Sequence, residues 1–292
     1  MAVDKKKSGK LNELADMFRD PYERKARGFP GLLMVLPVLV AVASTWGTKH
    51  PIITGVVGLL ISCGVIFALG NLARDLGKAK QEELVKAWGG MPTTWMLRHR
   101  DRTLEGGIKT IYHQLITQKL GLKMPTAQEE LADPVAADDV YGTAARMLRD
   151  TTRGREYSLL LKENISYGFR RNMYGARNLG WATSILGILI GIVLSGAVSA
   201  KPFGFDPTKL LDAPVASALT LGVSFAMFVA WFYFSAAAVR RMGVAYSERL
   251  LEALRTIPAP KAPRKKAATE LAKLSSASVD RGALMRAEDL HP

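Results

Sequence analysis

Four long stretches of the chain carry no charged side chain and are separated by segments rich in charge. They run from about Pro30 to Trp46, from Ile52 to Leu72, from Leu179 to Ala200 and from Pro214 to Val239. A helix needs about 20 predominantly apolar residues to cross the roughly 30 Å hydrocarbon core of a bilayer. Core helices of soluble proteins rarely run this far without a charge, so the pattern predicts four transmembrane helices.

Lysine and arginine are distributed unevenly around these stretches. Of the 40 in the chain, 37 lie before the first stretch, between the second and third, or after the fourth, and the other three are Lys49, Lys201 and Lys209. Four spans place all 37 on one side of the membrane, and the positive-inside rule identifies that side as the cytoplasm. We therefore expect a multi-pass protein of a bacterial inner membrane with both termini in the cytoplasm. This topology explains most of the net charge of +14, so nucleic acid is not an expected partner.

The expected fold class is an all-α integral membrane protein, with four transmembrane helices arranged as two hairpins and a helical cytoplasmic module between them. In chain order we expect a basic cytoplasmic N-terminal segment at 1–29, the first hairpin at 30–72, the module at 73–178, the second hairpin at 179–239, and a cytoplasmic helix end with a disordered basic tail at 240–292. The two outer connections are too short for an extracellular receptor domain. The function is therefore expected in the membrane or the cytoplasm.

The segment between the hairpins has the apolar spacing and the breakers of a helical bundle, and its strand signals are weak. Gly89-Gly90, followed by Pro92, is expected to end a cytoplasmic extension of the second span. Thr126 and Glu129 have the spacing of a capping box, which marks a helix start. The expected helices cover 74–88, 101–120, a short segment after the capping box, 136–152, and a last helix from 155 into the third span.

Small residues recur at every fourth position of two spans. They are Thr183, Gly187, Gly191 and Ser195 in the third span, and Ala218, Gly222 and Ala226 in the fourth. Small residues at this interval allow helix backbones to approach closely in a bilayer. The stripes predict tight helix packing, either within the chain or between copies of a homo-oligomer.

Basic and aromatic residues gather where the helices are expected to leave the membrane. The candidate surface consists of Arg170, Arg171, Tyr174, Arg177, Arg240 and Arg241. One interpretation is an interfacial belt in which long cations reach toward the head groups. The other is a binding surface for anionic lipids of the cytoplasmic leaflet or for an acidic protein partner.

Motifs of catalysis and cofactor binding were sought and not found in the sequence. Cys63 is the single cysteine, and the four histidines lack the spacing of a metal site. No glycine-rich phosphate loop is present, and the four apolar stretches contain no ionisable residue of the kind that proton-coupled transporters use. The sequence therefore predicts no catalytic, cofactor-binding or metal-binding residues and no enzymatic activity.

Three functions agree with this pattern. The first is a non-enzymatic scaffold, regulator or assembly component of the inner membrane that presents its helical module to a protein partner. The second is an oligomeric pore-forming or membrane-perturbing effector that the module gates. The third, which has the least support, is an enzyme that acts on lipid head groups. Dye leakage from liposomes would separate the first two.

Overall fold

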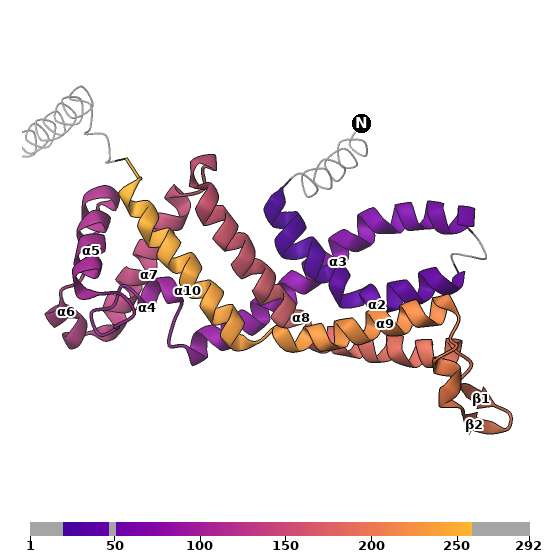
Figure 1. Ribbon diagram of the computed structural model, residues 1–292. Helices are drawn as coiled ribbons and strands as arrows, with labels where there is room; N and C mark the ends of the chain where they lie inside the picture. Colours follow the sequence, from indigo (N-terminus) through magenta and orange to yellow (C-terminus); the bar gives the residue numbers. More distant parts are fainter. Residues whose placement is uncertain (1–19, 47–50, 259–292) are drawn as a thin grey trace, which may run out of the picture.

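The computed structural model describes residues 20–46 and 51–258 as an elongated, mostly helical molecule (Figure 1). In chain order its elements are η1 (Glu23–Gly28), α2 (Phe29–Trp46), α3 (Pro51–Ala87), α4 (Pro92–Trp95), α5 (Gly106–Leu120), α6 (Ala127–Ala132), α7 (Pro134–Thr151), η2 (Arg155–Tyr157), α8 (Ser158–Leu194), β1 (Val198–Ala200), β2 (Phe203–Phe205), η3 (Pro207–Leu210), α9 (Val215–Ala230), η4 (Trp231–Tyr233), α10 (Ala236–Glu252) and η5 (Ala253–Arg255). The expected all-α class is confirmed.

Three helical segments of the described chain are long and apolar enough to cross a membrane. They are Glu23–Trp46, Ser158–Leu194 and Val215–Tyr233. The second predicted span lies on α3, which is helical from Pro51 to Ala87. Most side chains between 51 and 63 lie outside the described part, and so does the loop 47–50. The structure therefore supports a membrane protein, while the number of spans stays a prediction.

One end of the molecule is a bundle of the apolar helices, in which α2 packs against both α8 and α9 (Figure 1). Close backbone contact holds α2 against α3 as well. A Cβ atom at Gly31 would lie 2.6 Å from the carbonyl carbon of Leu69, so a larger residue would force the helices apart. Glycine at this crossing allows the first two apolar helices to pack as a hairpin.

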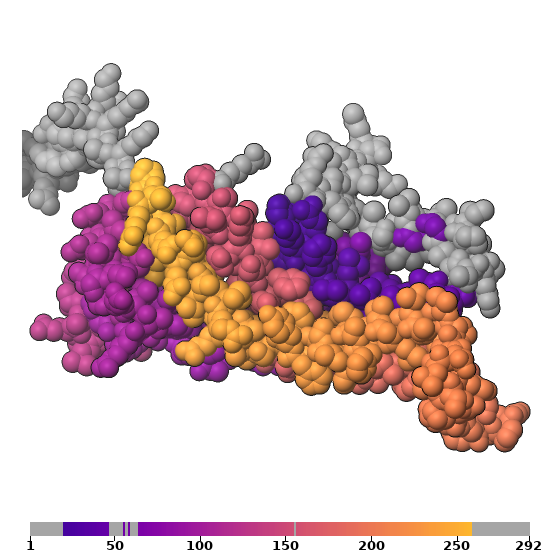
Figure 2. Space-filling view, viewed as in Figure 1, coloured from indigo at the N-terminus to yellow at the C-terminus, as the bar shows by residue number. Residues whose placement is uncertain are grey.

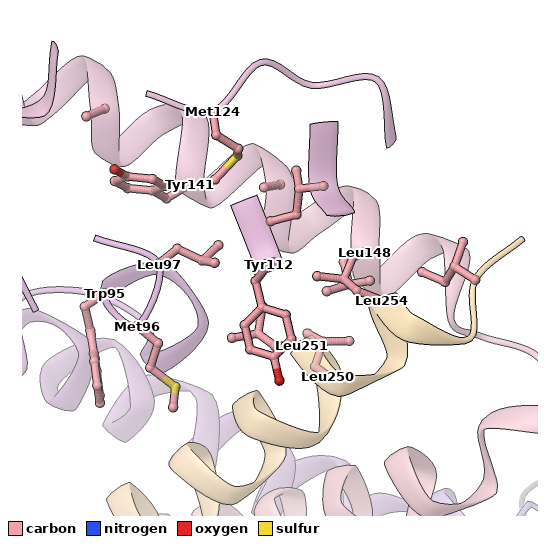
Figure 3. Close-up of a cluster of buried hydrophobic side chains, with 14 of the residues drawn as sticks. Trp95, Met96, Leu97, Tyr112, Met124, Tyr141, Leu148, Leu250, Leu251 and Leu254 are labelled. Atoms are coloured by element: carbon pink, nitrogen blue, oxygen red, sulfur yellow. The ribbon is translucent and has the colours of Figure 1, made fainter. Parts of the chain in front are cut away.

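The other end of the molecule is the helical module, which has a conventional apolar core. Figure 3 shows Trp95, Met96, Leu97 and Tyr112 converging on Leu148 and on three leucines, two of α10 and one of η5. Those leucines, Leu250, Leu251 and Leu254, are at most 1% exposed. The module is therefore completed by the helix that follows the second hairpin, in addition to the segment 73–178 that the sequence indicated.

Helices α3 and α8 run from one end of the molecule into the other, and α10 begins where the two ends meet. Leu84 of α3, Tyr167 of α8 and Val239 of α10 form a buried apolar cluster between the bundle and the module. The predicted continuation of the second span through 74–88 is confirmed, because α3 is unbroken to Ala87. Positive φ angles at Gly89 and Gly90 then turn the chain.

The third predicted span ends earlier than the sequence indicated. Helix α8 stops at Leu194, and Gly196 adopts a φ of 75°, which ends the helix in the left-handed region. Residues 198–200, which were expected to be helical, form strand β1, and β1 pairs antiparallel with β2. Three-residue strands are too short for alternation to reveal them, so the sequence analysis missed this hairpin.

The fourth predicted span is also shorter than expected. Regular helix ends at Ala230 and gives way to the 3₁₀ turn η4. Phe234 is extended, and the hydroxyl of Ser235 then accepts a hydrogen bond from the backbone N–H of Ala238 at 3.3 Å. Ser235 is therefore the N-cap of a new helix, α10, and residues 236–239 belong to that helix.

Within the module the sequence located most helix boundaries correctly. The capping box is confirmed, since Thr126 Oγ1 accepts from the backbone N–H of Glu129 at 3.2 Å and the carboxylate accepts in return from Thr126 N at 2.7 Å. Helix α5, however, begins at Gly106 and not near Asp101. Lys109 holds the preceding loop by donating to the carbonyls of Arg98 and Asp101. The predicted basic tail and the first 19 residues lie outside the described residues.

Candidate functional site

The break between α9 and α10 lies where the bundle meets the module, and a tryptophan anchors it. Trp231 is fully buried. Its indole ring lies against Gly180 of α8, where a Cβ atom would overlap the ring. Glycine at this position therefore allows the indole to pack directly on the α8 backbone, and this contact fixes the end of α9 to α8.

Two arginines of α8 hold the same break from the outside. The guanidinium of Arg170 lies over the ring of Tyr233, 4.4 Å from its centroid, and donates to its hydroxyl at 3.0 Å. Arg177 lies 4.8 Å from the ring centroid of Trp181 and donates to the carbonyl oxygen of Phe234 at 3.4 Å. Stacking on aromatic rings and capping a free carbonyl both stabilise a charged guanidinium where helices leave an apolar environment.

Arg171, also on α8, points into the molecule, away from the face that carries Arg170, and is buried. Its guanidinium donates to Gln81 Oε1 at 2.8 Å and to Asn172 Oδ1 at 3.0 Å. The amide of Asn172, which is fully buried, donates in turn to the carbonyl oxygen of Ala26 at 2.6 Å. This polar network joins η1, α3 and α8. Its inward position removes Arg171 from the lipid or partner surface that the sequence suggested.

The polar network coincides with a very close crossing of α3 and α8. A Cβ atom at Gly175 would lie 2.5 Å from the backbone nitrogen of Gly77. A Cβ atom at Gly77 would in turn lie 2.8 Å from the Cα of Asn172. Neither glycine was singled out in the sequence, because the contact joins residues almost 100 positions apart. The two helices therefore cross in direct backbone contact beside the break.

The other predicted surface residues lie around this junction. Tyr174 stacks on the guanidinium of Arg177, with 5.0 Å between the Cζ atom and the ring centroid. Arg240 and Arg241 are exposed on the first turns of α10. Arg240 also lies 5.8 Å from the ring centroid of Trp95, which belongs to the module. The cations other than Arg171 thus surround the junction, but aromatic side chains already contact three of them.

The small-residue stripe of α8 faces the inside of the bundle. A Cβ atom at Gly187 would lie 2.9 Å from Cβ of Pro37 and would overlap the hydroxyl of Ser224. At Gly191 it would lie 2.6 Å from Cγ of Leu221. The same stripe includes Thr183, whose hydroxyl donates to the carbonyl oxygen of Met34 at 2.5 Å, and the buried Ser195. This stripe therefore packs against α2 and α9 of the same chain.

The stripe of α9 faces outward. Ala218, Gly222 and Ala226 are all exposed, and a Cβ atom at Gly222 would meet no atom of the described residues within 4 Å. The face of α9 that packs in the bundle consists of Ser217, Thr220 and Ser224, which are fully buried. The sequence analysis did not single out these hydroxyl residues, although they recur at helical spacing.

Hydroxyl groups link the bundle helices to one another. Ser217 donates to the carbonyl oxygen of Gly191 at 2.7 Å, and Ser44 lies within 3.1 Å of the Thr220 hydroxyl. Such bonds join α9 to α8 and to α2. In an apolar environment a hydroxyl is satisfied only by another protein group, so these pairs favour one arrangement of the three helices.

The module contains a buried ionic network that holds the loop before α5. The Glu130 side chain accepts from the backbone N–H groups of His99 and Arg100 at 2.7 and 3.1 Å, and from the Tyr141 hydroxyl at 2.6 Å. The guanidinium groups of Arg98 and Arg100 both pair with Asp138. We call these five residues, Arg98, Arg100, Glu130, Asp138 and Tyr141, the loop clasp.

The environment of Glu130 keeps its carboxylate charged. Burial raises the pKa of this carboxyl, but the hydrogen bonds from Tyr141, the backbone and Arg100 outweigh burial and lower the pKa to about 2. Burial also lowers the pKa of the nearby His113, whose Nε2 atom lies 2.8 Å from the carbonyl oxygen of Leu97. Local sequence pattern does not reveal this network, because its partners are 11 to 40 residues apart.

The two histidines of the module lie side by side. The ring centroids of His99 and His113 are 4.8 Å apart, and Nε2 of His99 lies 2.9 Å from the carbonyl oxygen of Pro125. Within the described residues no group of three or more His, Cys, Asp or Glu side chains could hold a metal ion. Each histidine ring lies within hydrogen-bond distance of a backbone carbonyl oxygen, Pro125 for His99 and Leu97 for His113.

The outer surface of the module has an apolar cavity at the elbow between α6 and α7. It has a volume of about 400 Å³, and Met124, Ala132, Ala136 and Val140 line it. On the same two helices Leu131 is 84% exposed and Val135 is 73% exposed. Large exposed apolar side chains on a polar module are typical of a contact surface. We call Leu131, Val135 and this cavity the elbow surface.

Comparison with models of protein families, with curated proteins and with solved structures finds no match.

Proposed function

We propose that this protein is a non-enzymatic regulator or scaffold of a bacterial inner membrane, in which a cytoplasmic helical module binds a protein partner. Its four spans form two hairpins, with both termini and the module in the cytoplasm. The observation that carries the proposal is the continuity of α3 and α8 between bundle and module, together with the buried cluster that both helices form with α10. A partner bound to the module contacts a body that is built on the membrane helices themselves.

The distribution of charge supports the orientation. The three cations outside the proposed cytoplasmic segments include Lys201 and Lys209, which lie between α8 and α9. That connection is the end of the bundle farthest from the module (Figure 1). The positive-inside rule therefore agrees with a module in the cytoplasm.

The junction supports a regulatory role more than a purely structural one. Arg170, Arg177 and Trp231 fix α8 to the break between α9 and α10. A displacement of α10 in the module would change these contacts first. A partner that binds the module could thus alter the packing of the second hairpin, provided that it binds two arrangements with different affinity.

The elbow surface is the proposed docking site for the partner. Leu131 and Val135 present apolar area to solvent on the same two helices that line a cavity of about 400 Å³, which is large enough to receive one or two apolar side chains. Photo-crosslinking amino acids at Leu131 and Val135 in cells should give one discrete adduct with another protein. Thr110, which is exposed on α5, is the matched control position and should give none.

Adducts of equal intensity at Leu131 and Thr110 would mean that the elbow surface is not selective. The absence of any protein adduct from the whole module would contradict the scaffold proposal. In either case the purified full chain in liposomes would show whether the second candidate function holds.

The second candidate function is an oligomeric pore that the module gates, and one observation favours it. The stripe Ala218, Gly222 and Ala226 is exposed on α9, so two copies could approach closely along it. The interior of a single chain is closely packed at Gly187 and Gly191, so such a pore would form between chains. Release of an entrapped dye from liposomes that contain the full chain, abolished by Gly222→Leu, would support the pore.

A further inference from the structure

The hairpin β1–β2 separates its apolar and polar residues onto two faces. The register pairs Val198 with Phe205, Ser199 with Gly204, and Ala200 with Phe203. Directly opposed residues of an antiparallel pair project from the same face, and so do residues two apart along a strand. One face therefore carries Val198, Ala200, Phe203 and Phe205, and the other carries only Ser199 and Gly204.

The apolar face is uncovered. Phe203 is 86% exposed, Phe205 is 58% exposed and Val198 is 36% exposed. Within residues 20–46 and 51–258, no side chain covers enough of either phenylalanine to bury it. A hairpin of two short strands is marginally stable in water, and one with two exposed phenylalanines gains stability only when that face is covered.

The base of the hairpin is nevertheless well fixed to the bundle. The backbone N–H of Asp206 donates to the carbonyl oxygen of Ala197 at 2.8 Å, and Ala197 N donates to Ser195 Oγ at 3.2 Å. Ala197 is 1% exposed. The hairpin is therefore held at a defined place, directly after α8 and before α9.

That place is the end of the bundle away from the module. In Figure 1 the two strands extend sideways from the ends of α8 and α9, and in Figure 2 the same segment projects clear of the bundle surface. If α8 and α9 cross the bilayer, a hairpin in this position lies over the lipids beside the bundle. Both helices are long and apolar enough to cross.

We propose that the apolar face of the hairpin lies on the membrane surface opposite the module and is buried at the boundary of head groups and acyl chains. Phe203 and Phe205 are the anchors, and the exposed Lys201 in the turn contacts lipid phosphates. The occupant is lipid and not a second copy of the chain. Four side chains, one of them alanine, cannot supply the roughly 1,200 Å² that a stable protein interface buries.

This inference rests on the same membrane-crossing helices as the proposed function, so the test must separate the two. In a Cys63→Ala background, Phe203→Cys is labelled with an environment-sensitive fluorophore in the full chain, which is reconstituted into phosphatidylcholine–phosphatidylglycerol vesicles. Ser199→Cys, on the polar face of the same hairpin, is the matched control. Leu189→Cys, which is on the outer face of α8, reports whether the helix is in the membrane at all.

The label at position 203 should be quenched about twofold more than that at 199 by lipids spin-labelled close to the head group, since only one face contacts lipid. Iodide in the water should show the reverse order. The label at 189 should be quenched best by deeply spin-labelled lipids. Val198→Cys, on the same face as Phe203, should repeat the result if loss of the Phe203 ring disturbs the hairpin.

Two outcomes would overturn the inference while the label at 189 remains deep. In the first, the labels at 203 and 198 are as open to iodide as the label at 199. In the second, they are protected from iodide without lipid quenching and lose that protection on dilution into excess lipid, which would mean that a second copy covers the face. Exposure of the label at 189 to iodide would instead contradict the membrane-crossing helices and hence the proposed function.

Discussion

The bundle and the module distribute apolar and polar residues in opposite ways. In the module, Ile116 and Leu148 are at most 1% exposed and form the interior. In the bundle, Leu189 and Phe225 are 55% and 64% exposed, while Ser184 and Ser224 are fully buried. Water around the module favours burial of large apolar side chains. Lipid around the bundle removes that preference, so small residues and hydroxyl pairs determine which faces pack.

The bundle and the module also differ in which change of side-chain size they tolerate. Packing in the bundle depends on the absence of side chains, as at Gly31, Gly187 and Gly175, where a single Cβ atom would meet a neighbouring helix. Packing in the module depends on the presence of large side chains, which fill a common core. Substitutions that enlarge should therefore damage the bundle, and substitutions that shorten should damage the module.

The largest effect is expected from Gly187→Leu. The new side chain would overlap Ser224 and Pro37, so α8 must separate from α2 and α9 at a cost on the order of 3 kcal/mol or more. Thermal unfolding in detergent measures this loss. Gly222→Leu is the matched control, since its site is open, and should change the melting temperature little. Equal destabilisation by both would show that the inner face of α9 is wrongly identified.

Leu148→Ala should destabilise the module by about 3 kcal/mol, because it leaves a cavity in a fully packed core. Leu189→Ala removes the same atoms from a side chain that faces outward from the bundle, and it should have a much smaller effect. Limited proteolysis of the two variants in detergent compares them directly. If Leu189→Ala destabilised the protein more than Leu148→Ala, large apolar side chains would not face outward from the bundle as described.

Glu130→Gln should cost about 2 kcal/mol, since it removes a charged acceptor of several hydrogen bonds from a buried position. The effect should be confined to the module, and α5 with the loop before it should exchange amide hydrogens faster. Asp139→Asn changes an exposed carboxylate on α7 of the same module and is the matched control. Faster exchange in α2 or α9 would mean that the loop clasp stabilises the whole molecule.

The loop clasp also predicts a pH dependence. The pKa of Glu130 is about 2 in the folded chain against 4.5 for an unperturbed carboxyl, so the unfolded state takes up the proton first as the pH falls. The contribution of this group is complete above pH 4.5 and is lost progressively toward pH 2. Burial also lowers the pKa of His113 in the folded chain below its ordinary value of 6.5, so the unfolded state binds this proton first as the pH falls. His113 therefore also makes the folded module less stable as the pH falls below 6.5. Unfolding of Glu130→Gln should depend less on pH between 4.5 and 2, and an unchanged profile would contradict this role.

The smallest effect is expected at the junction. Arg170→Gln removes a cation–π contact and one hydrogen bond to Tyr233, both near the surface, and should cost less than about 1 kcal/mol. Arg171→Gln should cost more, because the Arg171 side chain and its partner Asn172 are buried. Comparison of the two variants by thermal unfolding separates the outer contact of Arg170 with Tyr233 from the buried network of Arg171. A larger loss of stability from Arg170→Gln than from Arg171→Gln would mean that Arg170, and not Arg171, makes the buried contacts.

The sequence predicted well what depends on local pattern. The helix ends at Gly89 and Gly121, the capping box at Thr126 and the presence of long apolar helices all follow from neighbouring residues. The orientation of each helix could not be predicted in this way. Arg170 and Arg171 are adjacent in sequence, yet one faces outward and the other inward, because the position of α3 decides which face of α8 is covered.

Helix orientation, which local sequence does not reveal, also decides which of the two small-residue stripes packs against another helix. Gly187 on α8 and Gly222 on α9 have the same spacing pattern, but only the first contacts another helix of the chain. Glu130 resembled any helix-surface carboxylate until its partners, His99 and Tyr141, were located by the fold. The hairpin at 198–205 was missed because two three-residue strands depend on their mutual register and carry little signal alone.

The most direct test of the four-span arrangement is the location of three chain positions relative to the membrane. A reporter active only in the cytoplasm is fused after Trp46, after Glu130 or after Asp206. Four spans with a cytoplasmic module predict signal after Glu130 and silence after Trp46 and Asp206. Signal after both Trp46 and Glu130 would show that α3 does not cross the membrane, and signal after Asp206 with silence after Glu130 would reverse the orientation of the whole protein.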